Sequence, residues 1–286
     1  MGSSTYKRRY EHLERQKIPQ GLVSEELEKQ LEKIKHRIIV LSGKGGVGKS
    51  TVALNLAVAL SLQNKKVGLL DIDIHGPTIP KMIGWKGKEI EVNENGKLTP
   101  VQLGDNLKVM SIGFLLPDED SSVIWRGPMK YRAIQQFLED VEWGELDYLL
   151  IDSPPGTGDE PLSIVQLLGK LEGAIIVATP QQVAVSSVRK SITFCRKLNV
   201  PILGVVENMS GFICPYCGAR IDIFSKGGAE KMAEEMKIPF LGRIPIDPHL
   251  VEISDAGQLL WNSGSHSQIR DIFEKIAVSL TENSQE

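Results

Sequence analysis

One stretch near the start of the chain has the residue types and the spacing of a phosphate-binding loop. It consists of Gly43, Lys44, Gly45, Gly46, Val47, Gly48, Lys49, Ser50 and Thr51. Residues 43–50 fit the pattern G-x-x-x-x-G-K-S, in which glycines let backbone N–H groups turn toward phosphate oxygens. In this pattern Lys49 reaches the β- and γ-phosphates and the hydroxyl of Ser50 ligates Mg²⁺. We therefore expect a nucleotide here.

The sequence on either side of the loop supports this interpretation. Residues 37–41 form a short apolar run rich in β-branched side chains, which is typical of a buried strand. After the loop, Val52, Leu56 and Leu60 recur at helical spacing. The order strand, loop, helix is the one that the motif requires, so we favour it over a glycine-rich turn that carries a solvated lysine.

Aspartates follow two other predicted strands. Asp71 and Asp73 come at the end of the strand at 66–71, and Asp152 comes at the end of the strand at 146–151. In a parallel sheet the carboxyl ends of strands beside a phosphate loop are where Mg²⁺ and an attacking water are bound. The alternatives are aspartates that cap helices or simply end a strand.

The loop after Asp152 reads Ser-Pro-Pro-Gly and has the form of a nucleotide-dependent switch. Asp152 is expected to hold Mg²⁺, through a water or through Ser50. The N–H of Gly156 is expected to sense the γ-phosphate, so that the loop takes different positions with ATP and with ADP.

Two cysteines form a second candidate site. Cys214 and Cys217 belong to the sequence C-P-Y-C-G, and two thiolates on such a tight turn supply half of a metal site. The third cysteine, Cys195, lies among apolar neighbours and is predicted to be in the core. A two-fold dimer would bring four thiolates together. Such a site suits Zn²⁺ or an iron–sulfur cluster, and the spacing does not choose between them. A redox pair or an incidental C-x-x-C is the alternative.

Composition limits the classes of partner. The chain has 286 residues with 33 basic and 36 acidic side chains, a formal charge of −3. This balance gives no general attraction to nucleic acid or to an anionic membrane. The N-terminus lacks the apolar run of a signal peptide. No stretch approaches the ~18 uninterrupted apolar residues that span a membrane. We expect a cytoplasmic protein that binds neither nucleic acid nor membrane.

Strands and helices alternate along the chain, which predicts an α/β fold with a mostly parallel sheet covered by helices on both faces. We expect an N-terminal extension at 1–36, with a peripheral helix from about Ser24 whose apolar stripe includes Ile34, and a P-loop ATPase domain at 37–286 that includes the cysteine turn at 214–217. The other expected strands lie at 107–112, 173–178, 202–206 and 240–244. Further helices are expected near 181–198, 227–237 and 267–280, and a hairpin is expected to turn at Asn95-Gly96.

The loop as a whole, GKGGVGKST, resembles the deviant Walker A loop of the MinD, ParA and nitrogenase iron-protein class. The chain further contains, in this order, DIDIHGPTIP, WRGPM, DSPPGTGD, ENMSGFICPYCG and GRIPIDP. This series resembles the Mrp/ApbC-type ATPases that carry iron–sulfur clusters, over about residues 36 to 280. ParA- and MinD-type proteins share the loop and the aspartates but lack WRGPM and the C-P-x-C.

The resemblance implies roles for residues at the nucleotide. Lys44 crosses a dimer interface to the partner's nucleotide, and with Lys49 and Asp73 it forms the catalytic set. Asp73 positions the attacking water, and Asp71 helps the metal shell. Asn208 reads adenine and Pro245 packs beside the base, which favours ATP.

The resemblance also implies a homodimer that carries a labile [4Fe-4S] cluster, bridged between subunits by Cys214 and Cys217 and delivered to apo iron–sulfur proteins. Zn²⁺ is able to take its place. Two other functions stay open: a ParA/MinD-like nucleotide-switched spatial regulator that binds DNA or membrane, and an ATPase whose cysteine turn holds zinc only to stabilise a dimer.

Overall fold

The structure is a computed structural model that describes residues 24–74, 76–87, 90–115, 127–214, 216–262 and 268–283. Trp125 and Arg126 of the WRGPM motif lie outside the described residues. The expected extension at 1–36 is described only from Ser24 onward.

A single sheet forms the centre of the described part of the chain. Parallel strands follow one another in the order β4, β2, β5, β1, β6, β7 and β9, while β3 and β8 are antiparallel additions beside β4 and β7. This confirms the mostly parallel sheet. The strands are β1 (Ile34–Ser42), β2 (Val67–Asp71), β3 (Val101–Leu103), β4 (Leu107–Ser111), β5 (Leu146–Asp152), β6 (Gly173–Ala178), β7 (Ile202–Ile213), β8 (Arg220–Ile221) and β9 (Phe240–Ile246).

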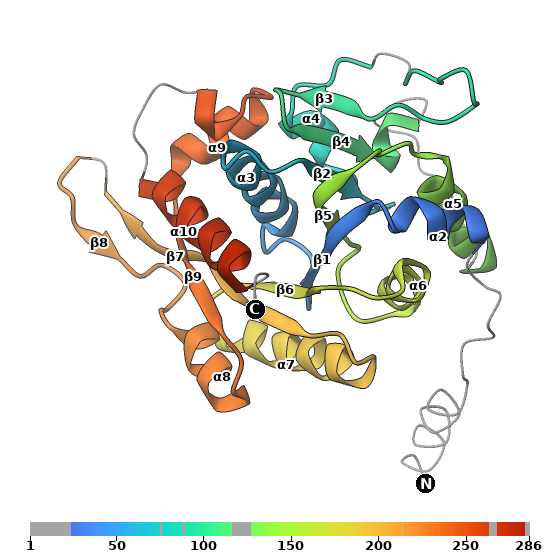
Figure 1. Ribbon diagram of the computed structural model, residues 1–286. Coiled ribbons are helices and arrows are strands. Elements are labelled where there is room, and N and C mark those ends of the chain that lie inside the picture. The colour runs from blue at the N-terminus through green and yellow to red at the C-terminus, as the bar shows by residue number, and fades with distance from the viewer. Residues whose placement is uncertain are drawn as a thin grey trace, which may run out of the picture.

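Helices cover both faces of this sheet, as predicted (Figure 1). On one face α3 and α10 pack together over the central strands, and on the other α7 lies over β6 and α8 lies over β7. The helices are α2 (Glu25–Leu31), α3 (Lys49–Leu62), α4 (Ile79–Met82), α5 (Gly127–Asp140), α6 (Asp159–Leu168), α7 (Gln182–Lys197), α8 (Gly228–Met236), α9 (Pro248–Asp255) and α10 (Gln268–Asn283). Short 3₁₀ turns lie at Ile112–Leu115 and Leu260–Asn262.

Two inner strands, β2 and β6, are apolar apart from Asp71 at the end of β2, because both of their faces are covered. Every residue of β2 and of β6 is buried. Strands buried on both sides read as continuous apolar runs, whereas strands with one wet face alternate. This explains why short runs of Val, Ile and Leu located the seven parallel strands of the described chain. The antiparallel strands β3 and β8 were not predicted, and β7 extends to Ile213, beyond the expected 202–206.

The N-terminal helix is shorter than its apolar stripe suggested. Ser24 caps α2 by accepting a hydrogen bond from the Leu27 N–H at 3.1 Å, as its sequence predicts. Ile34, however, begins β1 and pairs with Leu146 of β5. Ile34 is therefore part of the sheet, and the boundary expected at 36/37 falls within β1.

The predicted hairpin at Asn95-Gly96 is present only in a minimal form. The turn itself forms, with Gly96 at a φ of +75°. The two sides meet in one isolated antiparallel bridge between Val92 and Leu98, and the described residues on either side of the turn form no regular hairpin strands. A single bridge without a packed face supports little more than the turn.

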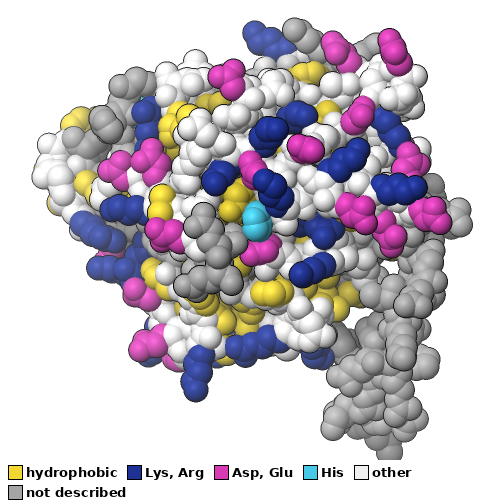
Figure 2. All heavy atoms as spheres, viewed as in Figure 1, with side chains coloured by type: hydrophobic (Ala, Val, Ile, Leu, Met, Phe, Trp, Pro, Cys, Tyr) yellow, Lys and Arg dark blue, Asp and Glu magenta, His cyan; other side chains and the backbone are white. Residues whose placement is uncertain are grey.

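The distribution of charged side chains on the surface is consistent with the nearly equal numbers of basic and acidic residues in the sequence. Basic and acidic side chains are interspersed over the face that Figure 2 shows. In the described residues, no helix combines the length and the apolar character that crossing a membrane requires.

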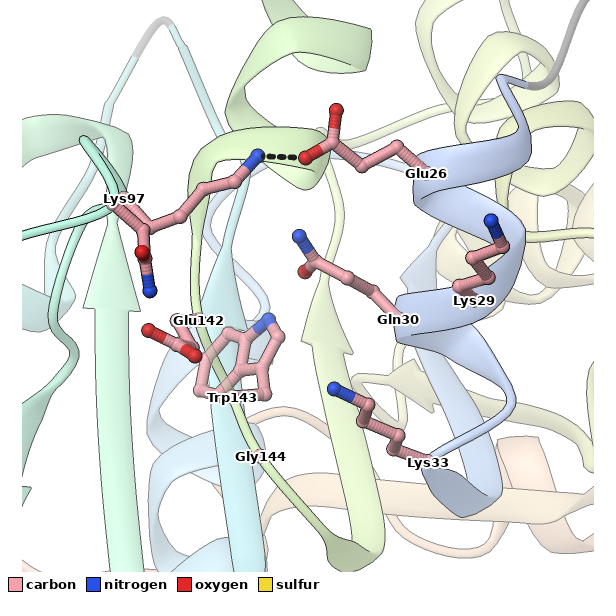
Figure 3. A pocket seen from close by; sticks show the side chains of 9 residues that line it. Glu26, Lys29, Gln30, Lys33, Lys97, Glu142, Trp143 and Gly144 are labelled. Atoms are coloured by element: carbon pink, nitrogen blue, oxygen red, sulfur yellow. Dashed lines mark ion pairs between the residues drawn. The ribbon is translucent and has the colours of Figure 1, made fainter.

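A polar cavity of about 230 Å³ lies beside α2. Figure 3 shows Gln30 and Trp143 within it and the ion pair between Lys97 and Glu26, 2.5 Å long, across one side. Gln30 comes shortly before the start of β1, and Trp143 comes shortly before the start of β5. The cavity is therefore at the edge of the sheet opposite to the phosphate loop.

Candidate functional site

The phosphate loop joins the end of β1 to the start of α3, as predicted, and its glycines are needed for geometric reasons. Gly48 has a φ of +79°, and a Cβ added there would lie 2.2 Å from Nδ2 of Asn208. A Cβ added at Gly43 would lie 2.4 Å from the carbonyl oxygen of Ser187. The backbone of the loop thus passes too close to β7 and α7 for side chains at these two positions.

The side chain of Lys49 points into a cluster of carboxylates. Its ammonium forms an ion pair with Oδ1 of Asp152 and lies 3.9 Å from Oδ2 of Asp73. Lys49 is only 6% exposed and Asp152 is fully buried. The structure therefore brings together the loop lysine, Asp152 at the end of β5 and Asp73 just after β2, as the strand-end argument predicted.

Asp71 lies next to this cluster and contacts the backbone of Asp73. It lies opposite Asp152 in the register of β2 and β5 and is fully buried. Its two oxygens accept hydrogen bonds from the Ser111 hydroxyl at 2.8 Å and from the Asp73 N–H at 3.1 Å. Burial, together with the charge of Asp152, raises the pKa of Asp71 to about 8.

This shifted pKa predicts how stability depends on pH. Folded Asp71 keeps its proton up to a pKa of about 8, whereas the unfolded group releases it near 3.8. The contribution of Asp71 to the free energy of unfolding is fully present below the pKa of the unfolded group. It is lost as pH rises through the pKa of the folded group, and the free energy of unfolding falls by at most about 1.4 kcal/mol per pH unit. We expect the Asp71→Asn variant to flatten this decline. Urea unfolding of nucleotide-free protein at pH values between these two pKa values measures the decline. Equal slopes in the wild type and in Asp71→Asn would contradict the raised pKa of Asp71.

The polar atoms of the site fit a magnesium ion. Oδ2 of Asp152 is buried and, within the described residues, has no hydrogen-bond partner. The half-buried Ser50 lies in the first turn of α3, next to Lys49. Carboxylate and hydroxyl oxygens, completed by water and phosphate, are the usual ligands of Mg²⁺.

The switch loop after β5 is held against β1 in this structure. The N–H of Gly156 donates to the carbonyl of Ser42 at 2.8 Å, and the hydroxyl of Ser153 donates to the carbonyl of Val40 at 2.9 Å. The predicted contact between the Gly156 N–H and a γ-phosphate therefore requires this hydrogen bond to open.

Two residues with roles implied by the resemblance make contacts within the chain. The ammonium of Lys44 donates to Oε1 of Gln181 at 3.4 Å, just before α7. The amide of Asn208 donates to the carbonyl of Val47 in the phosphate loop at 2.9 Å. Pro245 follows Ile244, the residue that pairs with Asn208 across β7 and β9, so it lies one position further along the neighbouring strand. The role of these two residues beside adenine stays a prediction.

The cysteine pair lies at the tip of the hairpin that β7 and β8 form. Cys214 and Ala219 close the turn through a 2.9 Å backbone hydrogen bond. The N–H groups of Tyr216 and Cys217, and the Cys217 side chain, lower the pKa of the Cys214 thiol. This favours the thiolate, the form that binds metals. Cys217 is exposed, whereas Cys195 is buried in the core as predicted.

The described part of the chain does not complete a metal site around these thiols. Within it, no group of three or more His, Cys, Asp or Glu side chains is placed to hold a metal ion. A metal bound at Cys214 and Cys217 needs ligands from elsewhere.

Sequence reasoning missed two supporting residues of the nucleotide site. Ser111 ends β4 beside β2, and the strand-end rule that found the aspartates was sufficient to find it. Gln181 had no such signal, because its contact with Lys44 joins residues 137 positions apart.

Comparison with known proteins identifies the family. A family model described as "NUBPL iron-transfer P-loop NTPase" matches residues 33–281. The chain belongs to this family. The match covers the phosphate loop, the strand-end aspartates and the cysteine turn.

Two named relatives are similar over most of their length. An "iron-sulfur cluster carrier protein" of Methanocaldococcus jannaschii is 54% identical over 252 residues, 87% of each chain. A "cytosolic Fe-S cluster assembly factor NUBP2 homolog" of Nematostella vectensis is 49% identical over 274 residues, 93% of this chain and 98% of the relative.

Solved structures confirm the P-loop NTPase fold. A nucleotide-binding protein from Archaeoglobus fulgidus, in complex with ADP, has a TM-score of 0.72 and 43% identity over 86% of this chain and 98% of the other. The cell division ATPase MinD of Pyrococcus furiosus has a TM-score of 0.64 and 25% identity over 87% of this chain and 99% of the other.

Proposed function

We propose that this chain is an ATP-hydrolysing carrier that holds an iron–sulfur cluster between the Cys214 and Cys217 pairs of two copies and delivers it to apoproteins. The observation that carries the proposal is the cysteine pair itself, which is accessible, favours thiolate and lacks further ligands in the described chain. The names of the relatives support the cargo, since one is an iron–sulfur cluster carrier and another an Fe–S assembly factor.

The surface around the cysteines favours a second copy of the chain as the source of the missing ligands. Large apolar side chains are exposed around the cysteines, and Tyr216 is 97% exposed. A two-fold contact would cover them and bring four thiolates together. The other exposed apolar residues of this hairpin and its continuation are Ile213, Ile221 and Ile223.

The nucleotide half of the proposal uses the carboxylate cluster. Lys49 would leave its ion pair with Asp152 to reach the phosphates, and Asp73 would position the attacking water. Asp71, whose oxygens both accept hydrogen bonds, would hold the backbone of Asp73 in place. Ser50 and Asp152 would hold Mg²⁺, which neutralises charge on the β- and γ-phosphates when bound.

Dimer closure would complete this site. Lys44 now contacts Gln181 of its own chain, and it would have to release that contact to reach the nucleotide of a partner. Asn208 and Pro245 would flank adenine, which makes ATP the expected nucleotide. Hydrolysis would then relax the loops around Asp73 and Asp152 and alter the cysteine bridge.

The first experiment measures metal and sulfide in anaerobically reconstituted protein, together with its visible absorption spectrum. Iron and sulfide at about four each per dimer would support the carrier. Stoichiometric zinc that resists replacement would instead indicate a structural zinc at the dimer interface and would overturn the carrier function.

We expect Asp73→Asn to reduce ATP hydrolysis by at least about 100-fold, because an amide cannot accept a proton from the attacking water. Nucleotide affinity should change little, since Lys49 and the loop backbone remain. Single-turnover phosphate release and equilibrium binding of a fluorescent ATP analogue measure the two effects. The control is Asp147→Asn, which removes a surface carboxylate paired with Lys35. Unchanged hydrolysis in Asp73→Asn would remove Asp73 from the catalytic set.

A further inference from the structure

Glu207 is a buried carboxylate to which the proposed mechanism gives no role. It precedes Asn208 in β7 and is fully buried. Four groups surround its two oxygens: the Ser210 hydroxyl at 2.6 Å, the Gly227 N–H at 3.1 Å, the Ala229 N–H at 2.8 Å and Nε of Arg243 at 3.3 Å. A charged group at this depth needs such partners, so the arrangement is specific.

Three of these partners come from the two ends of the segment that carries the cysteines, and Arg243 comes from β9. The chain leaves β7 at Ile213, passes through the hairpin and returns at Gly227, the residue that caps the N-terminus of α8. Figure 1 shows β8 projecting from the sheet and α8 lying against β7 and β9. Glu207 therefore ties the strand before the cysteines to the helix after them, and it satisfies the N–H groups at the positive end of that helix.

The strand between Glu207 and the cysteines is irregular. Asn208 pairs with Ile244 and Phe212 pairs with Ile246, so that three residues of β7 stand opposite Pro245 alone. Within this bulge Met209 has a φ of +57°. Non-glycine residues rarely adopt this conformation, and one that does requires the surrounding structure to hold it.

Ser210 is the middle residue of the bulge, and its hydroxyl donates to Glu207. The residue just before the bulge, Asn208, contacts the phosphate loop through the carbonyl of Val47. Cys214 lies just beyond the bulge. The chain thus runs from the phosphate loop, through a bulge held by Glu207, to the cysteine pair.

We propose that Glu207 is a positioning residue that makes the β7 bulge and the start of α8 move as one body, so that a displacement of the phosphate loop reaches the cysteine pair. The inference rests on the proposed function. Nucleotide that shifts Val47 also shifts Asn208, and the Glu207 network passes this shift to both ends of the cysteine segment. Without the network, the hairpin would keep its thiols but lose its response to nucleotide.

The test measures the affinity of the cysteine pair for Co²⁺, from the thiolate-to-cobalt absorption, with and without a non-hydrolysable ATP analogue. For the wild type we expect the two affinities to differ by about 5-fold or more, the lower end of common coupling between sites. In Glu207→Gln, which keeps the shape of the side chain and loses its charge, the ratio should fall to about one, while Co²⁺ still binds without nucleotide.

Two further variants separate this role from general stability. Ser210→Ala removes one hydrogen bond of the network, leaves the cap of α8 in place and should also reduce the ratio. Glu230→Gln is the matched control, because Glu230 is the other carboxylate paired with Arg243 but lies at the surface. This variant should keep the wild-type ratio. The midpoint of thermal unfolding, measured for each variant, shows whether the ratio falls without a matching loss of stability.

The outcomes distinguish this inference from the proposed function. A wild-type ratio in both Glu207→Gln and Ser210→Ala would overturn the inference, as would a wild-type protein that binds Co²⁺ without any response to nucleotide. In both cases the carrier function stands, because the cysteines still bind metal. A wild-type dimer whose cysteines bind neither Co²⁺ nor a cluster would overturn the carrier function itself.

Discussion

Replacing both Cys214 and Cys217 by alanine is expected to remove all iron and sulfide from reconstituted protein and to leave ATP binding unchanged. The two thiols are the proposed ligands at the tip of the β7–β8 hairpin, and in the described chain they are not part of a group of three or more side chains that could hold a metal ion. Four-cysteine sites are held by thiolates alone, so losing two ligands per copy leaves nothing to hold a cluster. Iron and sulfide analysis together with ATP titration measures both effects.

Cys195→Ala is the matched control for this variant. Cys195 is buried in α7, and burial raises the pKa of its thiol to about 12. It cannot supply a thiolate at neutral pH, so this variant should keep its iron and sulfide. Retention of iron and sulfide by the double variant, or their loss in the Cys195 variant, would show that the cluster is bound elsewhere.

The parts of this protein that the sequence predicted depend on local patterns. The phosphate loop is one continuous motif, and its strand and helix follow from apolar spacing. Asp71, Asp73 and Asp152 come at strand ends, and parallel strands end at the same edge of a sheet. Their cluster around Lys49 was therefore predictable without knowing which strands are neighbours.

The contacts that organise the site beyond these motifs were not predictable in the same way. Asn208 contacts a residue 161 positions away. Glu207 contacts Arg243 and the start of α8 because the fold places β7, β9 and α8 side by side. A glutamate in an apolar strand carries no local sign of its partners. Ile34 was misplaced for a related reason, because one apolar residue fits the stripe of a helix as well as the start of a strand.

The second prediction with a large effect concerns Lys49. We expect Lys49→Met to lower the free energy of unfolding of nucleotide-free protein by about 3–5 kcal/mol, because it leaves the buried carboxylate of Asp152 without its cation. The same change should abolish ATP binding, since no ammonium remains to reach the phosphates. Urea unfolding and ATP titration measure the two losses.

Two variants test whether the lost stability comes from the unpaired charge. Adding Asp152→Asn to Lys49→Met removes that charge and should restore part of the stability while ATP binding stays absent, because a buried amide costs far less than a buried carboxylate without a partner. Lys44→Met removes the other lysine of the loop. Within the described residues this half-buried side chain donates to a neutral amide and forms no ion pair, so the stability of the variant should stay within about 0.5 kcal/mol of wild type. If Lys49→Met were as stable as Lys44→Met, the carboxylates around Lys49 would have to be protonated or solvated in the free protein. The ion pair would then contribute nothing to folding, and the lysine would be retained for the nucleotide alone.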